Sequence, residues 1–155
     1  MTATNHAVAG ALIAAVVRQP LWAIPLAFLS HFVMDAIPHF GIDEVGEDVY
    51  ARNRQRSFRW VVRADLLLAL LSLVLLPIIL QPIVPWYVTL TCSIVAMSPD
   101  IAWVYRYVIE IHTGKLIPKN RFSRFHSWLQ RERRRGIVLE IGWLIASLVV
   151  VAKLI

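Results

Sequence analysis

The sequence predicts an all-α integral membrane protein, in which a single domain of 155 residues holds about five transmembrane helices. The first observation is composition: 58% of the residues are hydrophobic and only 17% are charged, and the mean hydropathy is +0.62. The second is a set of apolar runs at 61–80, 83–97 and 137–152, which approach the roughly 20 residues that cross a bilayer. These features exclude an ordinary soluble domain.

The first two predicted membrane helices span about 5–17 and 21–37, and residues 18–20 turn the chain between them. The first helix is rich in Ala and Gly, which allow a neighbouring backbone to approach closely. Its apolar stretch has the length of a signal-peptide core, but no Lys or Arg precedes it. We therefore expect it to be retained as part of the structure.

The remaining membrane helices are predicted at about 57–80, 83–112 and 136–155, and the Ser98-Pro99-Asp100 step is expected to divide the second of these. The only cysteine, Cys92, lies inside this divided segment and excludes an internal disulfide. No Gly-rich phosphate-binding loop interrupts these elements.

Residues 119–135 are predicted to form a basic amphipathic helix that lies in the membrane interface. Phe122, Phe125 and Leu129 share one helical face with His126. Their apolar side chains would face the lipid, while the arginines of the segment face anionic headgroups. This arrangement would hold His126 over the end of the helix bundle.

The Lys and Arg residues indicate the orientation of the chain. Five lie from Arg52 to Arg63 and nine from Arg106 to Arg135, so 14 of the 16 fall on the side that holds the N-terminus. By the positive-inside rule this side is cytoplasmic, and we expect a multi-pass protein of the bacterial inner membrane. The net charge of +6 concentrated there favours anionic membrane lipids as partners over nucleic acid. An oligomer is left open.

Carboxylate and imidazole side chains share this one-sided placement. On the predicted topology, no Asp, Glu or His falls on the opposite side, although that side has comparable helix ends. The positive-inside rule accounts for Lys and Arg but not for acids and histidines. We infer a shared site at the cytoplasmic end, with the candidate metal ligands His6, His31, Asp35, Asp65, Asp100 and His126.

The pair His31 and Asp35 gives the most specific signal within this set. The two residues are four apart, so a helix places both on one face. They could bind one ion or neighbouring ions of a two-metal centre. Mixed nitrogen and oxygen ligation suits zinc best, with manganese or iron as alternatives, and the ligand set allows roughly one to three divalent ions.

Simpler explanations remain open for the other candidates. Asp65 could pair with Arg63 or Arg59, and Asp100 could be a turn or N-cap residue after Pro99.

Similar alternatives apply at the helix ends and in the loops. His6 could cap the first turn near the interface, and Glu140 could neutralise the basic cluster 133–135. His39 and His112 are expected in loops, where a solvated histidine is an ordinary finding.

Three short motifs resemble those of the bacterial membrane-bound metal-dependent hydrolases, which are small inner-membrane proteins. The motifs are Thr-x-His at 4–6, Ser-His-x-x-x-Asp at 30–35 and Pro-Asp at 99–100. The resemblance implies metal-binding roles for His6, His31, Asp35 and Asp100. The His-x-x-x-Asp pair is also similar to that of zinc-dependent phospholipases C, which are soluble helical proteins.

These residues predict a metal-dependent hydrolase that acts at the cytoplasmic face on a phospholipid or lipid-phosphate headgroup. Glu140 is expected to be a metal ligand or the general base, and His39 a proton donor or a group that supports the ligands. The candidate residues for binding the anionic headgroup are Arg121, Arg124, Arg131 and Arg134.

Two other functions are compatible with the sequence. A divalent metal-ion or proton transporter, or a sensor, would also use intramembrane Asp and His, but it needs polar groups at several depths. A structural or partner-binding protein would use its acids to neutralise basic loops, but this does not explain acids and histidines inside apolar helix ends. The sequence leaves open whether the loop 40–56 contributes to the site.

Overall fold

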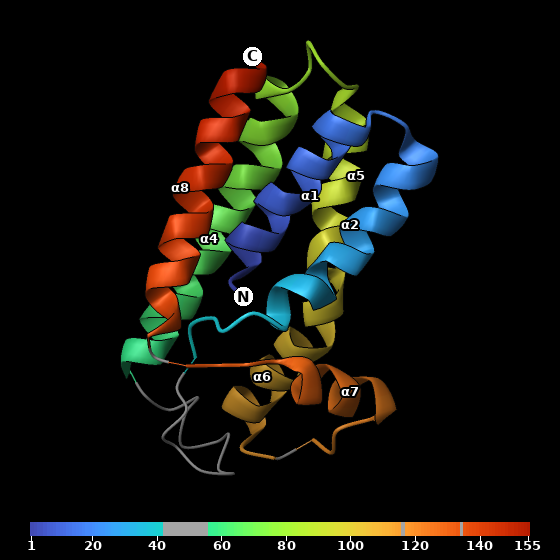
Figure 1. Ribbon diagram of the computed structural model, residues 1–155. Coiled ribbons are helices and arrows are strands. Elements are labelled where there is room, and N and C mark those ends of the chain that lie inside the picture. Colours follow the sequence, from blue (N-terminus) through green and yellow to red (C-terminus); the bar gives the residue numbers. More distant parts are fainter. Residues whose placement is uncertain (42–55, 116, 134) are drawn as a thin grey trace.

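The computed structural model of the protein describes residues 1–41, 56–115, 117–133 and 135–155. All named elements in these residues are helices, which confirms the all-α prediction (Figure 1). In chain order they are α1 (Ala3–Val17), α2 (Pro20–Asp35), α4 (Arg56–Ile79), α5 (Trp86–Met97), the 3-10 helix η1 (Ser98–Asp100), α6 (Ile101–Thr113), α7 (Arg121–Leu129) and α8 (Gly136–Leu154).

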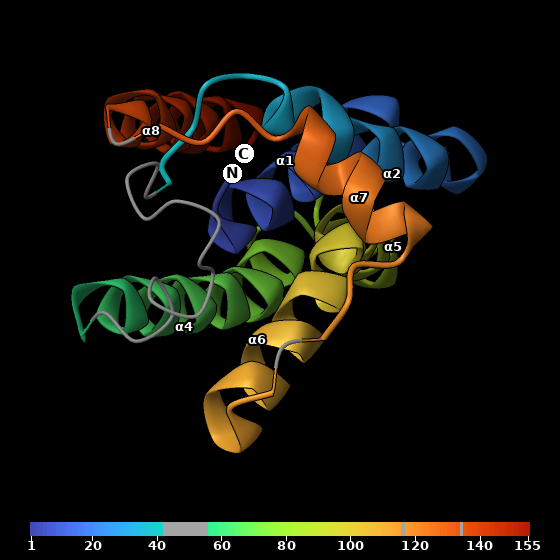
Figure 2. The same cartoon turned by 90° about the horizontal axis from the view of Figure 1, so that it is seen from below.

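Helix α1 forms the centre of the bundle and contacts α2, α4, α5 and α8 (Figure 2). Small side chains make this position possible, since Ala7, Ala11 and Ala14 are fully buried. At Gly10, an added Cβ would lie 2.4 Å from the carbonyl oxygen of Cys92 on α5. The predicted close approach at the small-residue helix is therefore present.

Three segments are long and apolar enough to cross a membrane: Phe58–Ile79, Trp86–Thr113 and Gly136–Leu154. Helices α1 and α2 are apolar but contain only 15 and 16 residues. At 1.5 Å per residue they reach about 24 Å, which is less than the bilayer core of about 30 Å. Three of the five predicted spans are thus supported by length and composition, and membrane spans at α1 and α2 stay predictions.

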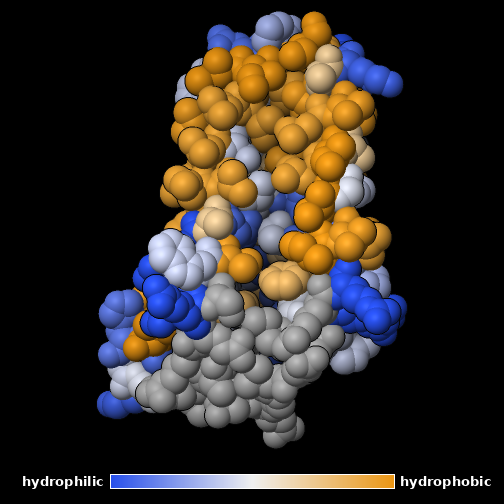
Figure 3. Space-filling view, turned by 90° about the vertical axis from the view of Figure 1, so that its left-hand side faces the viewer, coloured by the Kyte–Doolittle hydropathy of each residue, from blue (hydrophilic) through white to orange (hydrophobic). Residues whose placement is uncertain are grey.

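The surface of the molecule agrees with a membrane location. Figure 3 shows one face on which apolar side chains cover a broad band, with hydrophilic residues beyond it at both ends. The exposed side chains of α4 include Leu67, Leu70 and Val74, and those of α8 include Ile141 and Ile145. In lipid, such side chains need no further protein cover.

Prolines account for two of the differences between predicted and observed helix ends. Helix α2 ends at Asp35 instead of 37, because Pro38 disfavours helical geometry at the residue before it. Helix α5 begins only at Trp86, directly after Pro85. The 3-10 turn at Pro99 separates α5 from α6 where the sequence predicts a division.

The amphipathic helix is shorter than predicted. Helix α7 covers only Arg121–Leu129 of the segment 119–135. It begins where the side chain of Asn120 accepts a hydrogen bond of 2.7 Å from the backbone N–H of Ser123, an ordinary helix N-cap.

Backbone pairing with the segment after α2 ends this helix. The N–H of Arg131 donates to the carbonyl oxygen of Asp35 at 3.2 Å, and the N–H of His39 donates to that of Arg131 at 3.1 Å. The N–H of Arg133 then donates to the carbonyl oxygen of His39 at 2.7 Å. These bonds replace the helical ones that residues 130–133 would otherwise make.

The segments that carry most of the described Lys and Arg residues lie at one end of the bundle. The N-terminus, α6, α7 and the segment 36–41 lie at this end, whereas the C-terminus and the turns 18–19 and 80–85 lie at the other (Figure 1). We call the first the basic end. Its composition agrees with the one-sided placement predicted from the sequence.

Glycine substitutions test the close contact between α1 and α5. We expect Gly10→Ala to destabilise the protein by about 1–3 kcal/mol, because its Cβ would overlap a backbone carbonyl. Gly142→Ala in α8 is the matched control, since a Cβ there meets nothing within 4 Å. Thermal unfolding in detergent measures the effect, and equal melting temperatures for the two variants would contradict the observed packing.

Candidate metal centre

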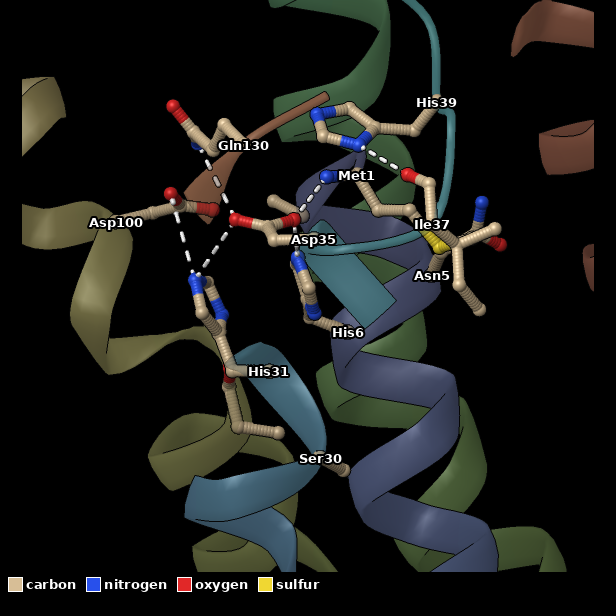
Figure 4. Close-up of polar contacts among 12 residues, drawn as sticks. Met1, Asn5, His6, Ser30, His31, Asp35, Ile37, His39, Asp100 and Gln130 are labelled. Carbon is tan, nitrogen blue, oxygen red and sulfur yellow. Dashed lines mark hydrogen bonds and ion pairs between the residues drawn. The ribbon is translucent and has the colours of Figure 1, made fainter. Parts of the chain in front are cut away.

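Four potential ligands converge at the basic end of the bundle: His31, Asp35, Asp100 and His126. One ligand atom from each lies within 4.8 Å of those of the other three. His31 and Asp35 come from the last turns of α2, Asp100 from η1 and His126 from α7. Figure 4 shows the carboxylate of Asp35 between the surrounding side chains.

The spacing of the four donor groups fits a single metal ion. His126 Nε2 lies 2.8 Å and His31 Nε2 lies 3.3 Å from Asp35 Oδ2. The two Nε2 atoms are 2.9 Å apart, and each is 3.8 Å from Asp100 Oδ1. Ligand atoms around one tetrahedral zinc ion lie about 3.4 Å from one another. These four residues could therefore hold a metal ion after small adjustments.

The surroundings of His31 orient it as a ligand. Its Nδ1 lies 2.8 Å from the carbonyl oxygen of Ala96, which can only accept a hydrogen bond. The proton is thus assigned to Nδ1, and Nε2 presents its lone pair to the centre. A metal-binding histidine is typically fixed by such a bond from its other ring nitrogen.

Three of the four candidate ligands are buried, and the protein itself supplies one cation beside them, because the amino group of Met1 contacts Asp35 Oδ1. His31 and Asp35 are fully buried, and His126 is only 4% exposed. A carboxylate at the end of an apolar helix is costly unless it is paired or bound to a cation. Asp100 differs from the other three, because its side chain is 18% exposed.

His6 lies beside the four-residue group and contacts Asp35. Its Nε2 is 3.2 Å from Asp35 Oδ1, and its ring stacks on that of His31 with centroids 4.0 Å apart. The amino group of Met1 also contacts Asp35 Oδ1. His6 therefore holds the oxygen of Asp35 that faces away from His126, and its role as a metal ligand stays a prediction.

Asp65 lies apart from the group and caps α1 instead. Its carboxylate oxygens accept hydrogen bonds from the backbone N–H groups of Ala3 at 2.8 Å and Thr4 at 3.0 Å. The hydroxyl of Thr4 donates to it at 2.7 Å. An acidic group at a helix N-terminus is stabilising. We therefore leave Asp65 out of the candidate centre. Among the described residues, Asp65 forms no ion pair with Arg63 or Arg59, and the guanidinium of Arg63 lies 5.5 Å from the centre of the Trp60 ring.

Glu140 and His39 have partners outside the four-residue group. Glu140 Oε1 accepts a hydrogen bond of 3.1 Å from the N–H of Phe40, and Oε2 lies 3.5 Å from Asn5 Nδ2. Glu140 thus ties α8 to α1 and to the segment after α2. His39 Nδ1 lies 2.9 Å from the carbonyl oxygen of Ile37. The structure gives neither residue a direct place beside the candidate metal.

The arginines predicted to bind a headgroup lie on the surface. Arg121, Arg124 and Arg131 are exposed, and Arg134 lies outside the described residues. The acidic residues of the loop 42–55 lie outside them as well. His112 is exposed near the end of α6, in agreement with a solvated histidine.

Two polar residues of this end were not identified from the sequence. Gln130 Nε2 donates to Asp35 Oδ2 at 3.2 Å, and its position four residues after His126 is the signal that could have revealed it.

Glu110 is 1% exposed and lies 3.4 Å from Arg106, four residues earlier. Its carboxylate also accepts a hydrogen bond of 3.4 Å from the N–H of Ile117, which ties the end of α6 to the segment that follows it.

A cavity of about 230 Å³ opens beside the group. Its polar lining includes Asp100, Gln130 and His39, and its remaining walls come mainly from apolar side chains of α4 and α6. A ligand in this cavity would reach the candidate centre through Asp100.

Comparisons of the chain with known protein families, curated proteins and solved structures give no significant match. The resemblance to membrane-bound metal-dependent hydrolases therefore rests on the short motifs alone. Their histidine and aspartate residues lie at or beside the centre, but the hydroxyl residues do not. Thr4 bonds Asp65, and the hydroxyl of Ser30 donates to the carbonyl oxygen of Ala27 at 2.8 Å.

Metal binding tests the four-residue group directly. Purified protein treated with chelator and reloaded with zinc should bind about one ion per chain. We expect His126→Ala and Asp35→Asn to weaken binding by at least about tenfold, because the first removes a donor nitrogen and the second replaces an anionic carboxylate oxygen with a neutral amide oxygen. Elemental analysis and titration calorimetry measure the stoichiometry and affinity, and circular dichroism verifies the fold.

Two variants serve as controls for this experiment. His112→Ala removes an exposed histidine of α6 and should leave zinc binding unchanged. Asp65→Asn should also keep the metal while losing about 1–2 kcal/mol of stability with its cap. Loss of zinc in these controls, or its retention in a His31→Ala, His126→Ala double variant, would contradict the assigned centre.

Proposed function

We propose that the protein is a membrane-embedded metal-dependent hydrolase, acting at the cytoplasmic face of a bacterial inner membrane on a phospholipid or lipid-phosphate headgroup. One observation carries the proposal: a buried group of two imidazoles and two carboxylates lies at the basic end of an apolar bundle and adjoins a cavity through Asp100. Such a convergence of a concave site with metal-binding residues is typical of a hydrolytic centre.

The donor set favours one zinc ion, with manganese or iron as alternatives. His6 and Asp35 Oδ1 would supply only two ligands to a second ion, so we propose a single one. A bound zinc ion would lower the pKa of a coordinated water to about 7 and polarise the phosphoryl oxygen of the substrate.

The four residues would divide into three ligands and one base. Catalytic zinc sites use three protein ligands and leave a position for water. His31, His126 and Asp35 are the three whose donor atoms lie closest together. Asp100 is more distant, partly exposed and faces the cavity. We therefore assign it the general base, in place of Glu140.

The surrounding surface suits an anionic substrate in a membrane. The exposed arginines Arg121, Arg124 and Arg131 lie at the same end as the centre, where the positive-inside rule places the cytoplasm. Phe122 and Phe125 of α7 are also exposed, and an interfacial position would cover them with lipid. Guanidinium groups bind phosphate well in this setting.

A metal-ion or proton transporter is the alternative from another class. It requires titratable or ligating groups along a path through the membrane. In the described part of the chain, the acids and histidines gather at the basic end, and the buried polar residues further along α5 are the uncharged Thr89 and Ser93. This distribution favours chemistry at one face.

Turnover in detergent distinguishes these functions. Zinc-loaded protein should hydrolyse phosphatidic acid or a related lipid phosphate without any ion gradient. We expect Asp100→Asn to keep its zinc but lose turnover by about 10²–10⁴-fold, as expected for a missing general base. Asp35→Asn should lose both metal and activity, and His112→Ala should retain both. Ion flux in sealed vesicles, with no hydrolysis across a broad lipid panel, would contradict the hydrolase.

A further inference from the structure

Most of the cavity beside Asp100 is lined by apolar side chains. Its apolar walls include Phe58, Val62 and Leu66 of α4 and Trp103 and Val104 of α6, while Asp65 and Glu132 join Asp100 in its polar lining. Its volume of about 230 Å³ is far above the roughly 10–15 Å³ that a single water needs. Such walls favour an apolar chain segment over a cluster of waters.

Aromatic rings join the two helices at one side of this cavity. The ring of Phe58, near the start of α4, contacts Trp103 and Tyr107 of α6, with centroids 6.5 Å and 6.3 Å apart. Phe58 is buried, so the helices are in contact at the basic end. Figure 2 shows α4 and α6 on the same side of the bundle, viewed from this end.

Further along α4 and α6, side chains that line the cavity are also exposed on the outer surface of these helices. Leu66 is 55% exposed and Val104 is 45% exposed, although both line the cavity. Both belong to segments long and apolar enough to span a bilayer. An apolar groove that opens on such helices is continuous with the hydrocarbon of the bilayer, and the most abundant apolar group there is a lipid acyl chain.

We infer that the groove between α4 and α6 holds one acyl chain of the substrate, with its phosphate headgroup directed toward Asp100 and the candidate metal. This inference rests on the proposed hydrolase and adds the place in the protein where an acyl chain of its lipid substrate binds. The substrate enters sideways from the bilayer, and its chain remains partly in lipid. Phosphate esters without a chain leave the groove empty and are poor substrates.

Selectivity for the chain tests the inference separately from the hydrolase itself. Wild-type protein should hydrolyse a long-chain phosphatidic acid with a kcat/KM at least about tenfold above that for a chain-free phosphate monoester such as glycerol phosphate. Leu66→Trp fills the groove and should reduce this ratio. Leu67→Trp is the matched control, because Leu67 is on the same helix, is 59% exposed and does not line the cavity. Equal turnover of both substrates would overturn the inference while the hydrolase stands.

A second measurement does not depend on turnover. A phosphatidic acid with a diazirine in its acyl chain should crosslink to peptides of α4 and α6 in the intact protein, and Leu66→Trp should reduce this labelling more than Leu67→Trp. Uniform labelling of all lipid-facing helices, α8 included, would overturn the assigned groove. Labelling of α4 and α6 without hydrolysis of any lipid would support the acyl-chain site and contradict the proposed hydrolase function.

Discussion

The structure depends on the burial of one carboxylate, that of Asp35, at the end of an apolar helix. In a low-dielectric setting this charge needs partners on both oxygens. The ring of His126 contacts one oxygen, and His6 and the amino group of Met1 contact the other. Because His126 lies on α7, His6 on α1 and Asp35 on α2, satisfying the carboxylate brings three separate segments together.

The backbone around Asp35 extends this effect. Its carbonyl oxygen accepts the N–H of Arg131, and Gln130 donates to its side chain. These bonds end α7 and direct the following chain along the segment after α2. The same residue that would bind the candidate metal therefore helps to hold the amphipathic helix against the bundle, together with the ring contacts of Phe32 with Phe122 and Phe125.

Much of this arrangement could be predicted from the sequence, since helical spacing and apolar runs are local properties. The spacing of His31 and Asp35 places both on one face, and the apolar face of α7 carries His126 as expected. Asp65 could not be assigned correctly, because it caps a helix that lies about sixty positions earlier in the chain. Burial of a carboxylate does not distinguish a cap from a metal ligand.

The proposal of Asp100 as the general base, in place of Glu140, also required the structure. Glu140 carries the same chemistry as Asp100, but Glu140 is held by Phe40 and Asn5, whereas Asp100 faces the cavity. Such a difference arises from tertiary packing and leaves no periodic signal. The α4–α6 groove is of the same kind, because each of its walls is an ordinary apolar helix in the sequence.

X-ray absorption at the zinc edge tests the central claim most directly, since it reports the atoms that bind the metal. We expect nitrogen and oxygen ligands at about 2.0–2.2 Å, with outer-shell scattering from two imidazole rings that disappears when His31 and His126 are both replaced by alanine. A sulfur ligand at about 2.3 Å would point to Cys92, the only cysteine. That result, or a spectrum of hydrated zinc unchanged by the substitutions, would contradict the centre.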